Sequence, residues 1–101
     1  LDPCPNTVIE AMSSGLPILF SDSGGIRELV GSSAGIGLAV PEDWNEIHVP
    51  TCEDIGYGML KIAENAKNMG EEARVRAITK FDIKAWIERH SEIFDTLRRD
   101  L

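Results

Sequence analysis

The chain has 101 residues, of which 43% are hydrophobic, and this size and composition suit one small globular domain. Its formal net charge is −7 and it has no run of lysine or arginine, which argues against nucleic acid as a partner. No stretch approaches the ~20 consecutive apolar residues that cross a bilayer, and no targeting segment stands at the start, so the sequence predicts a cytoplasmic protein.

The two cysteines, Cys4 and Cys52, lie far apart and match no metal-binding or redox spacing. Free thiols in a reducing cytosol are the favoured interpretation, and a disulfide between them stays an open alternative. Leu1 stands where an initiator methionine would, so the chain begins either at a processed end or, as we favour, at the cut edge of a longer protein.

The first predicted element is a short helix over residues 7–14. Asn6 is its expected N-cap and Gly15 its expected C-terminal stop. Helical spacing gives this helix a buried face of three residues, Val8, Ile9 and Met12.

A strand is predicted next, over the continuous apolar run LPILFS at residues 16–21, which is typical of a parallel strand covered on both faces. The turn SDSGG follows, and IRELV at 26–30 predicts one or two helical turns before a break at Gly31. GIGLAV at 35–40 predicts a second strand, closed by Pro41.

The chain after Pro50 is predicted to be helical. Thr51 and Asp54 have the spacing of a capping box, and helical periodicity then continues to an expected end at Gly70. A second helix is predicted over 71–80. Asp82 is placed to cap a third helix, in which Trp86, His90, Ile93 and Leu97 share one face expected to be packed.

Helices and strands alternate along the chain, which predicts the α/β class with a few parallel strands flanked by helices. The stretch 42–51 is a long irregular loop to which the sequence assigns no role. No Asp-x-Asp pair occurs, so the sequence predicts no metal ion, and nothing in it calls for a cofactor.

The clearest candidate for chemistry is the start of the first helix, because ligands of doubly wound sheets bind beyond the strand ends, where helix N-termini gather. The backbone N–H groups of Asn6, Thr7 and Val8 would be unpaired there and favour an anion such as a diphosphate. The Glu10 carboxylate, one turn further, can lean back over the same site and bind a diol such as a ribose. Asp2 offers a second carboxylate to sugar hydroxyls.

These two acids also have a simpler interpretation. Acidic residues are common near helix starts because they complement the helix dipole, so Asp2 and Glu10 could be ordinary solvated partners of the helix. From the spacing alone, this simpler interpretation is the favoured one.

The stretch DPCPNTVIEAMSSGLPILFSDSGGIREL, residues 2–29, resembles the C-terminal, donor-binding domain of the GT-B glycosyltransferases. The similarity is to retaining family four, whose motif is Glu-x7-Glu, a helix, a small-Gly-x-Pro step, a strand ending in serine and aspartate, and Gly-Gly-x-x-Glu. Residues Glu10, Ser14–Pro17, Ser21–Asp22 and Gly24–Glu28 match it in order. The later helices follow the family's tail, so the resemblance covers nearly the whole chain.

The resemblance implies roles for residues of the opening segment. It places Glu10 on the ribose hydroxyls of a nucleotide diphosphate sugar, and the amides of the loop between the two acids on the diphosphate and sugar. That loop corresponds to four residues here, Pro5, Asn6, Thr7 and Val8. Asp2 replaces the first glutamate of the motif, a shorter acid in the place that contacts the donor sugar. Glu28 and the glycines before it are interpreted as structural, with Glu28 as a helix cap.

The same resemblance implies what the chain lacks. The family's donor domain has six parallel strands, of which this chain would supply two, and the N-terminal acceptor domain is absent. We therefore expect part of a Rossmann-like GT-B domain over 1–101, belonging to a hexosyltransferase and inactive alone. The alternative is a non-catalytic structural or oligomerisation segment that binds no donor. A strand edge left open by the missing neighbours would favour a homodimer.

Overall fold

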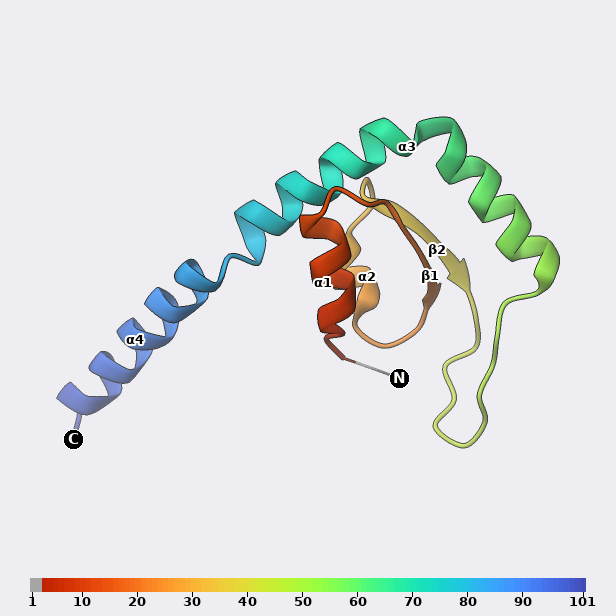
Figure 1. Ribbon diagram of the computed structural model, residues 1–101. Coiled ribbons are helices and arrows are strands. Elements are labelled where there is room, and N and C mark those ends of the chain that lie inside the picture. Colours follow the sequence, from red (N-terminus) through yellow and green to blue (C-terminus); the bar gives the residue numbers. More distant parts are fainter. Residues whose placement is uncertain (1–2) are drawn as a thin grey trace.

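The computed structural model describes residues 3–101, and Asp2, a predicted donor contact, therefore lies outside the described residues. The chain forms two parallel strands surrounded by helices, as the sequence predicts (Figure 1). In chain order the elements are α1 (Asn6–Ser13), β1 (Ile18–Asp22), α2 (Ile26–Val30), β2 (Gly35–Ala39), α3 (Cys52–Lys80) and α4 (Ile83–Arg99). Within this part of the chain, no helix is long and apolar enough to span a membrane.

The two strands pair in parallel, with Ile18 opposite Gly35 at one end and Asp22 opposite Ala39 at the other. Helix α2 lies in the crossover between them, and α3 arches over α1 and both strands (Figure 1). This arrangement confirms the predicted α/β class. Helix α4 extends away from the rest of the molecule.

Helix α1 begins one residue earlier than predicted. Its N-cap is Pro5, whose extended backbone (φ −72°, ψ 118°) supplies no capping side chain, and Asn6 is already helical. The prediction of Asn6 as N-cap is therefore wrong. The reason is that the fixed φ of proline suits the start of a helix, so the chain turns immediately after it.

The C-terminus of α1 follows the prediction closely. Gly15 has a positive φ of 77°, which glycine adopts without steric cost. The Gly15 N–H donates to the Met12 carbonyl at 2.9 Å, and the Leu16 N–H donates to the Ala11 carbonyl at 3.1 Å. These two bonds form a Schellman motif, which satisfies carbonyls that the helix itself leaves unpaired.

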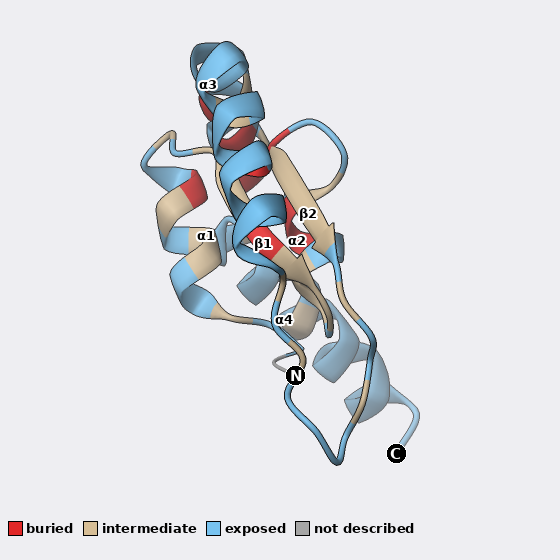
Figure 2. Ribbon diagram, turned by 90° about the vertical axis from the view of Figure 1, so that its right-hand side faces the viewer, coloured by how far each residue is buried: buried red, intermediate tan, exposed pale blue. Residues whose placement is uncertain are grey.

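The core is small and lies where α1, α2, the strands and the second half of α3 meet (Figure 2). Met12 and Val30 are fully inaccessible to solvent. Of the predicted buried face of α1, Met12 is buried while Val8 and Ile9 are half-buried. The other buried hydrophobic residues are Phe20, Leu29, Ala34, Ala73 and Ala77.

Helix α3 runs without a break through Gly70, so the predicted helix end there is wrong. Its one non-helical residue is Asn65 (φ −126°, ψ 20°), which marks a kink. An ideal Cβ on Gly70 would lie 2.3 Å from the Gly15 carbonyl oxygen. Gly70 is therefore the point where the backbone of α3 contacts the backbone at the end of α1. The local sequence around a glycine does not distinguish such a contact from the end of a helix.

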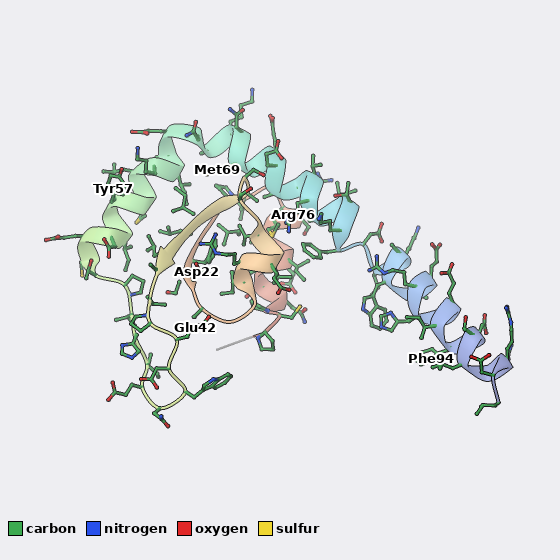
Figure 3. The ribbon with its side chains drawn as sticks, turned by 180° about the vertical axis from the view of Figure 1, so that it is seen from behind. Asp22, Glu42, Tyr57, Met69, Arg76 and Phe94 are labelled. Atoms are coloured by element: carbon green, nitrogen blue, oxygen red, sulfur yellow. The ribbon has the colours of Figure 1, made fainter. Side chains whose placement is uncertain are left out.

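An arginine on α3 fastens this helix to α2. The Arg76 Nε donates to the Leu29 carbonyl at 2.6 Å, and Nη2 donates to the Glu28 carbonyl at 2.7 Å (Figure 3). Both carbonyls belong to the last turn of a five-residue helix, where backbone acceptors lack helical partners. The bonds hold α2 against α3, and with it the turn that follows β1.

The caps of the two long helices are as predicted. The Thr51 hydroxyl accepts a hydrogen bond from the Asp54 N–H at 3.1 Å, and the Asp82 carboxylate accepts one from the Lys84 N–H at 2.9 Å. Helix α3 begins at the residue after Thr51, and helix α4 begins at the residue after Asp82.

The predicted packing of the apolar face of α4 is wrong for the described residues, since none of its residues is buried. Trp86 stacks on His90 at 3.8 Å between ring centroids, yet remains 49% exposed. The apolar face lies open because α4 leads away from the core instead of folding back on it (Figure 1). The large exposed apolar residues of α4 are Ile83, Trp86, Ile87, Ile93, Phe94 and Leu97.

The sheet leads to a first testable expectation, which concerns self-association. Within residues 3–101, β1 pairs with β2 alone, so a further strand can add to the sheet. We expect a homodimer joined at or near β1, the simplest closed arrangement, detected by analytical ultracentrifugation. A monomer at high concentration, with slow amide exchange along 16–21, would contradict this expectation.

Candidate functional site

The first turn of α1 supplies fewer free amides than the sequence suggests. The Val8 N–H donates to the Pro5 carbonyl at 3.2 Å, which closes a tight first turn. Pro5 has no N–H of its own. The backbone N–H groups of Asn6 and Thr7 are therefore the ones without a carbonyl partner in the helix. Of the three amides predicted to bind an anion, two are left for a ligand.

Glu10 is exposed on α1, four residues after Asn6, so the two side chains lie on the same helix face. Its backbone carbonyl accepts hydrogen bonds from the hydroxyls of Ser13 and Ser14, at 2.7 and 3.1 Å. Its carboxylate forms no ion pair within the described residues. This geometry suits a diol ligand and a solvated acid equally, so the donor role of Glu10 stays a prediction.

A groove between α1 and α4 opens beside this turn, and the sequence analysis did not find it. Its volume is about 440 Å³, within the range of small-molecule sites. The groove joins residues more than 70 positions apart, which no local pattern brings together. We call it the α1–α4 groove; it is lined by Cys4, Asn6, Ile9, Leu29, Lys80, Phe81, Ile83, Trp86 and Arg89.

A second groove of about 370 Å³ lies beside the glycine turn that follows β1. An ideal Cβ on Gly25 would lie 1.8 Å from the Pro3 carbonyl oxygen, so only glycine allows this approach. The predicted capping role of Glu28 is wrong, because Gly25 is the N-cap of α2 and no side chain caps it. Instead Glu28 lines the groove with Glu42 and Trp44, and Trp44 is 86% exposed.

An ion pair fixes the carboxyl end of β1. The Arg27 Nε donates to Asp22 Oδ2 at 2.8 Å, and Nη2 of the same guanidinium lies 2.6 Å from that oxygen. This hydrogen bond lowers the pKa of Asp22 below its usual range and raises the pKa of Arg27. The pair spans the glycine turn, so it holds the turn's two ends together while both groups are charged.

The loop of unassigned role gathers three possible metal ligands. His48 Nε2 lies 3.3 Å from Asp43 Oδ2 and 4.0 Å from Glu46 Oε2, and the three atoms lie within 4.8 Å of one another. A hydrogen bond from the Asn45 N–H, followed by one from His48, lowers the pKa of Asp43. The hydrogen bond between His48 and Asp43 accounts for this arrangement without an ion, so we assign no metal to it.

Comparison with known proteins gives a partial relationship. No family model matches the chain, and no solved structure matches it. It is similar to the O-antigen biosynthesis glycosyltransferase WbnH and to the probable O-antigen biosynthesis glycosyltransferase WbiN, both of Escherichia coli. Each is 35% identical over 89 residues, which cover 88% of this chain and 23% of the relative. The chain thus spans about a quarter of the length of these curated relatives.

Proposed function

We propose that the chain is the donor-site segment of a glycosyltransferase with the GT-B fold, of retaining family four. The enzyme would transfer a hexose from a nucleotide diphosphate sugar to an acceptor hydroxyl with retention of configuration. The observation that carries this proposal is the similarity to two glycosyltransferases over 88% of the chain. The parallel strands flanked by helices are compatible with part of a Rossmann-like domain.

In this proposal the opening of α1 binds the donor. The amides of Asn6 and Thr7 face the diphosphate, where backbone donors and the helix dipole stabilise the charge that develops on the leaving group. The carboxylate oxygens of Glu10 accept hydrogen bonds from the ribose hydroxyls. Pro5 and Val8 shape the turn that presents these groups, and Asp2 contacts the sugar.

The rest of the reaction requires parts that this segment does not provide. An N-terminal acceptor domain and further strands of the donor domain would hold the acceptor and the base. The segment contributes by orienting the donor and stabilising the diphosphate. Alone it is expected to be inactive, and the enzyme is proposed to act in the cytoplasm.

A second candidate function is a non-catalytic structural or oligomerisation module that binds no donor. The observation that favours it is the apolar face of α4, where six large hydrophobic residues are each about half exposed or more within residues 3–101. Contiguous exposed apolar surface of this kind marks an interaction site.

Titration with uridine or guanosine diphosphate separates the two functions. Because the pocket for the base is missing, we expect Kd around millimolar, an affinity of ~4 kcal/mol. Amide chemical-shift changes in NMR spectra should centre on residues 6–10, and uridine or guanosine alone should cause none there. A spectrum unchanged at ten times that concentration would support the structural module, and tight binding would show a more complete pocket than proposed.

A further inference from the structure

The apolar face of α4 forms one continuous stripe along the helix. Because an α-helix turns by about 100° per residue, the six large hydrophobic residues of this face fall within an arc of about 120°. At its first turn the face also lines the α1–α4 groove, through Ile83 and Trp86, and further along α4 leads away from the other elements (Figure 1). The most exposed of the six is Phe94, at 65% (Figure 3). An apolar stripe exposed along a whole helix marks an interaction surface.

Three aromatic rings follow one another along this face. Trp86 stacks on His90, and the edge of the His90 ring meets Phe94 with 6.5 Å between the centroids. The His90 Nδ1 donates to the Trp86 carbonyl at 2.8 Å, which holds the imidazole against the helix. The neighbouring rings therefore restrain one another. A tryptophan ring has a large apolar surface and one polar N–H, a combination that suits the boundary between water and an apolar phase.

The charged residues of α4 are sorted around the apolar face. Three of its four cations, Lys84, Arg89 and Arg98, lie at about 80–120° from the centre of the face, with Arg89 on one side and the other two on the opposite side. Its acids lie further round, at about 140–160° from that centre. These acids are Glu88, Glu92 and Asp95.

One of the bordering cations has a partner on its own helix. Arg98 lies 3.5 Å from Asp95, one turn earlier, and the two side chains are 80% and 55% exposed. An ion pair this exposed contributes little free energy and exchanges readily for another anion. The pair therefore leaves Arg98 able to bind a phosphate group at the border of the face.

We propose that α4 binds the surface of an anionic phospholipid bilayer. Its apolar face enters the boundary between headgroups and acyl chains, and Lys84, Arg89 and Arg98 extend from the borders of the face to the lipid phosphates. The acids on the far side of the helix stay in water. This inference concerns α4 alone and goes beyond the proposed function, since it does not depend on a donor site at α1.

The acidity of the whole chain does not prevent this attraction. Residues 1–51 contain seven acids and one cation, whereas α4 contains four cations and three acids. Helix α4 has 17 residues, a length of about 25 Å, and leads away from the acidic part (Figure 1). At physiological ionic strength, exposed charges further apart than about 8 Å are largely screened from one another. The charges of α4 itself therefore decide how it meets a charged surface.

The test uses vesicles of phosphatidylglycerol and phosphatidylcholine in equal parts, with vesicles of phosphatidylcholine alone for comparison. In a Trp44→Phe chain, Trp86 is the one remaining tryptophan. On the mixed vesicles its emission should shift to the blue, and brominated acyl chains should quench it. In a Trp86→Phe chain, which keeps Trp44 on the loop, neither change is expected. Quenching of Trp44 without quenching of Trp86 would overturn the inference.

An apolar substitution tests the contact with the acyl chains. Phe94→Ser should weaken binding to the mixed vesicles about tenfold or more, the loss expected when one buried phenylalanine ring is removed. The matched control is Tyr57→Ser, which removes a ring of α3 that is similarly exposed, at 62%. It should leave the affinity unchanged, and equal losses in the two variants would contradict a contact through α4.

Two charge substitutions test the contact with the lipid phosphates. Lys84→Gln and Arg89→Gln should each weaken binding to the mixed vesicles about fivefold, the contribution of one cation near an anionic surface. Neither should change the weaker binding to phosphatidylcholine alone. Lys67→Gln removes one cation from α3 as the matched control. Equal affinity of the parent chain for the two kinds of vesicle would overturn the inference.

Sedimentation without lipid distinguishes the other possible covers of this face. A dimer that Phe94→Ser dissociates, together with no binding to vesicles, would assign the face to a second copy of the chain. A monomer that binds no vesicles would assign it to another part of a longer protein. Either result overturns the inference. Circular dichroism verifies that each variant is folded, which we expect because no residue of α4 is buried.

Discussion

Replacing Gly70 by alanine is expected to lower the free energy of unfolding by about 2–3 kcal/mol. The new Cβ would lie 2.3 Å from the backbone oxygen of Gly15, a distance at which α3 or the end of α1 must move. Because the core has few buried residues, it has little stability in reserve. Urea denaturation followed by circular dichroism measures the loss.

The same helix provides a matched control. An ideal Cβ on Gly56 meets no atom within 4 Å, so Gly56→Ala removes backbone flexibility without a clash. We expect it to stabilise the chain by about 0.5–1 kcal/mol, the usual helix preference for alanine over glycine. If both variants shift the unfolding midpoint in the same direction, the contact between Gly70 and Gly15 does not decide the packing of α3.

This contact also bears on the candidate site. Gly15 ends α1, and Gly70 sets how closely α3 approaches that end. The other end of α1 presents Asn6 to the α1–α4 groove, which residues of α3 and α4 also line. A shift of α3 against α1 would therefore alter the distance between Asn6 and Lys80, and with it the width of this groove.

Local patterns account for the elements that the sequence predicted correctly. Gly15, Thr51 and Asp82 act through atoms within a few residues of themselves, so their roles are visible in a short window. The strands were found because two continuous apolar runs are each closed by a turn or proline. Their observed bounds, Ile18–Asp22 and Gly35–Ala39, differ from the predicted ones by two residues or fewer.

The features that the sequence missed depend on residues far apart in the chain. The local sequence predicts that Gly70 ends a helix. In the structure a glycine is needed there because the backbone of Gly15, 55 positions earlier, lies against it. The α1–α4 groove joins Asn6 to Lys80 and Trp86, which no short window of the sequence places together. Of the candidate site, the sequence could therefore nominate α1, but not the groove next to it.

In the glycosyltransferase that we propose contains this chain, Glu10→Gln is expected to lower donor turnover at least tenfold, and far more than Glu28→Gln does. Glu10 lies on the face of α1 above Asn6, and the change removes charge-assisted hydrogen bonds to a diol, each contributing about 1.5–3 kcal/mol. Steady-state kinetics with varied donor concentration provides the measurement.

Glu28 is an informative comparison because it is also an exposed glutamate in a short helix of the same half of the chain. Its backbone carbonyl, not its carboxylate, receives the bond from Arg76, so Glu28→Gln keeps that contact. Glu28 lines the second groove, together with Trp44, and not the α1–α4 groove. Kinetics that show Glu10→Gln as active as the parent would contradict the proposed ribose contact, and a larger loss for Glu28→Gln would favour a donor site in the second groove.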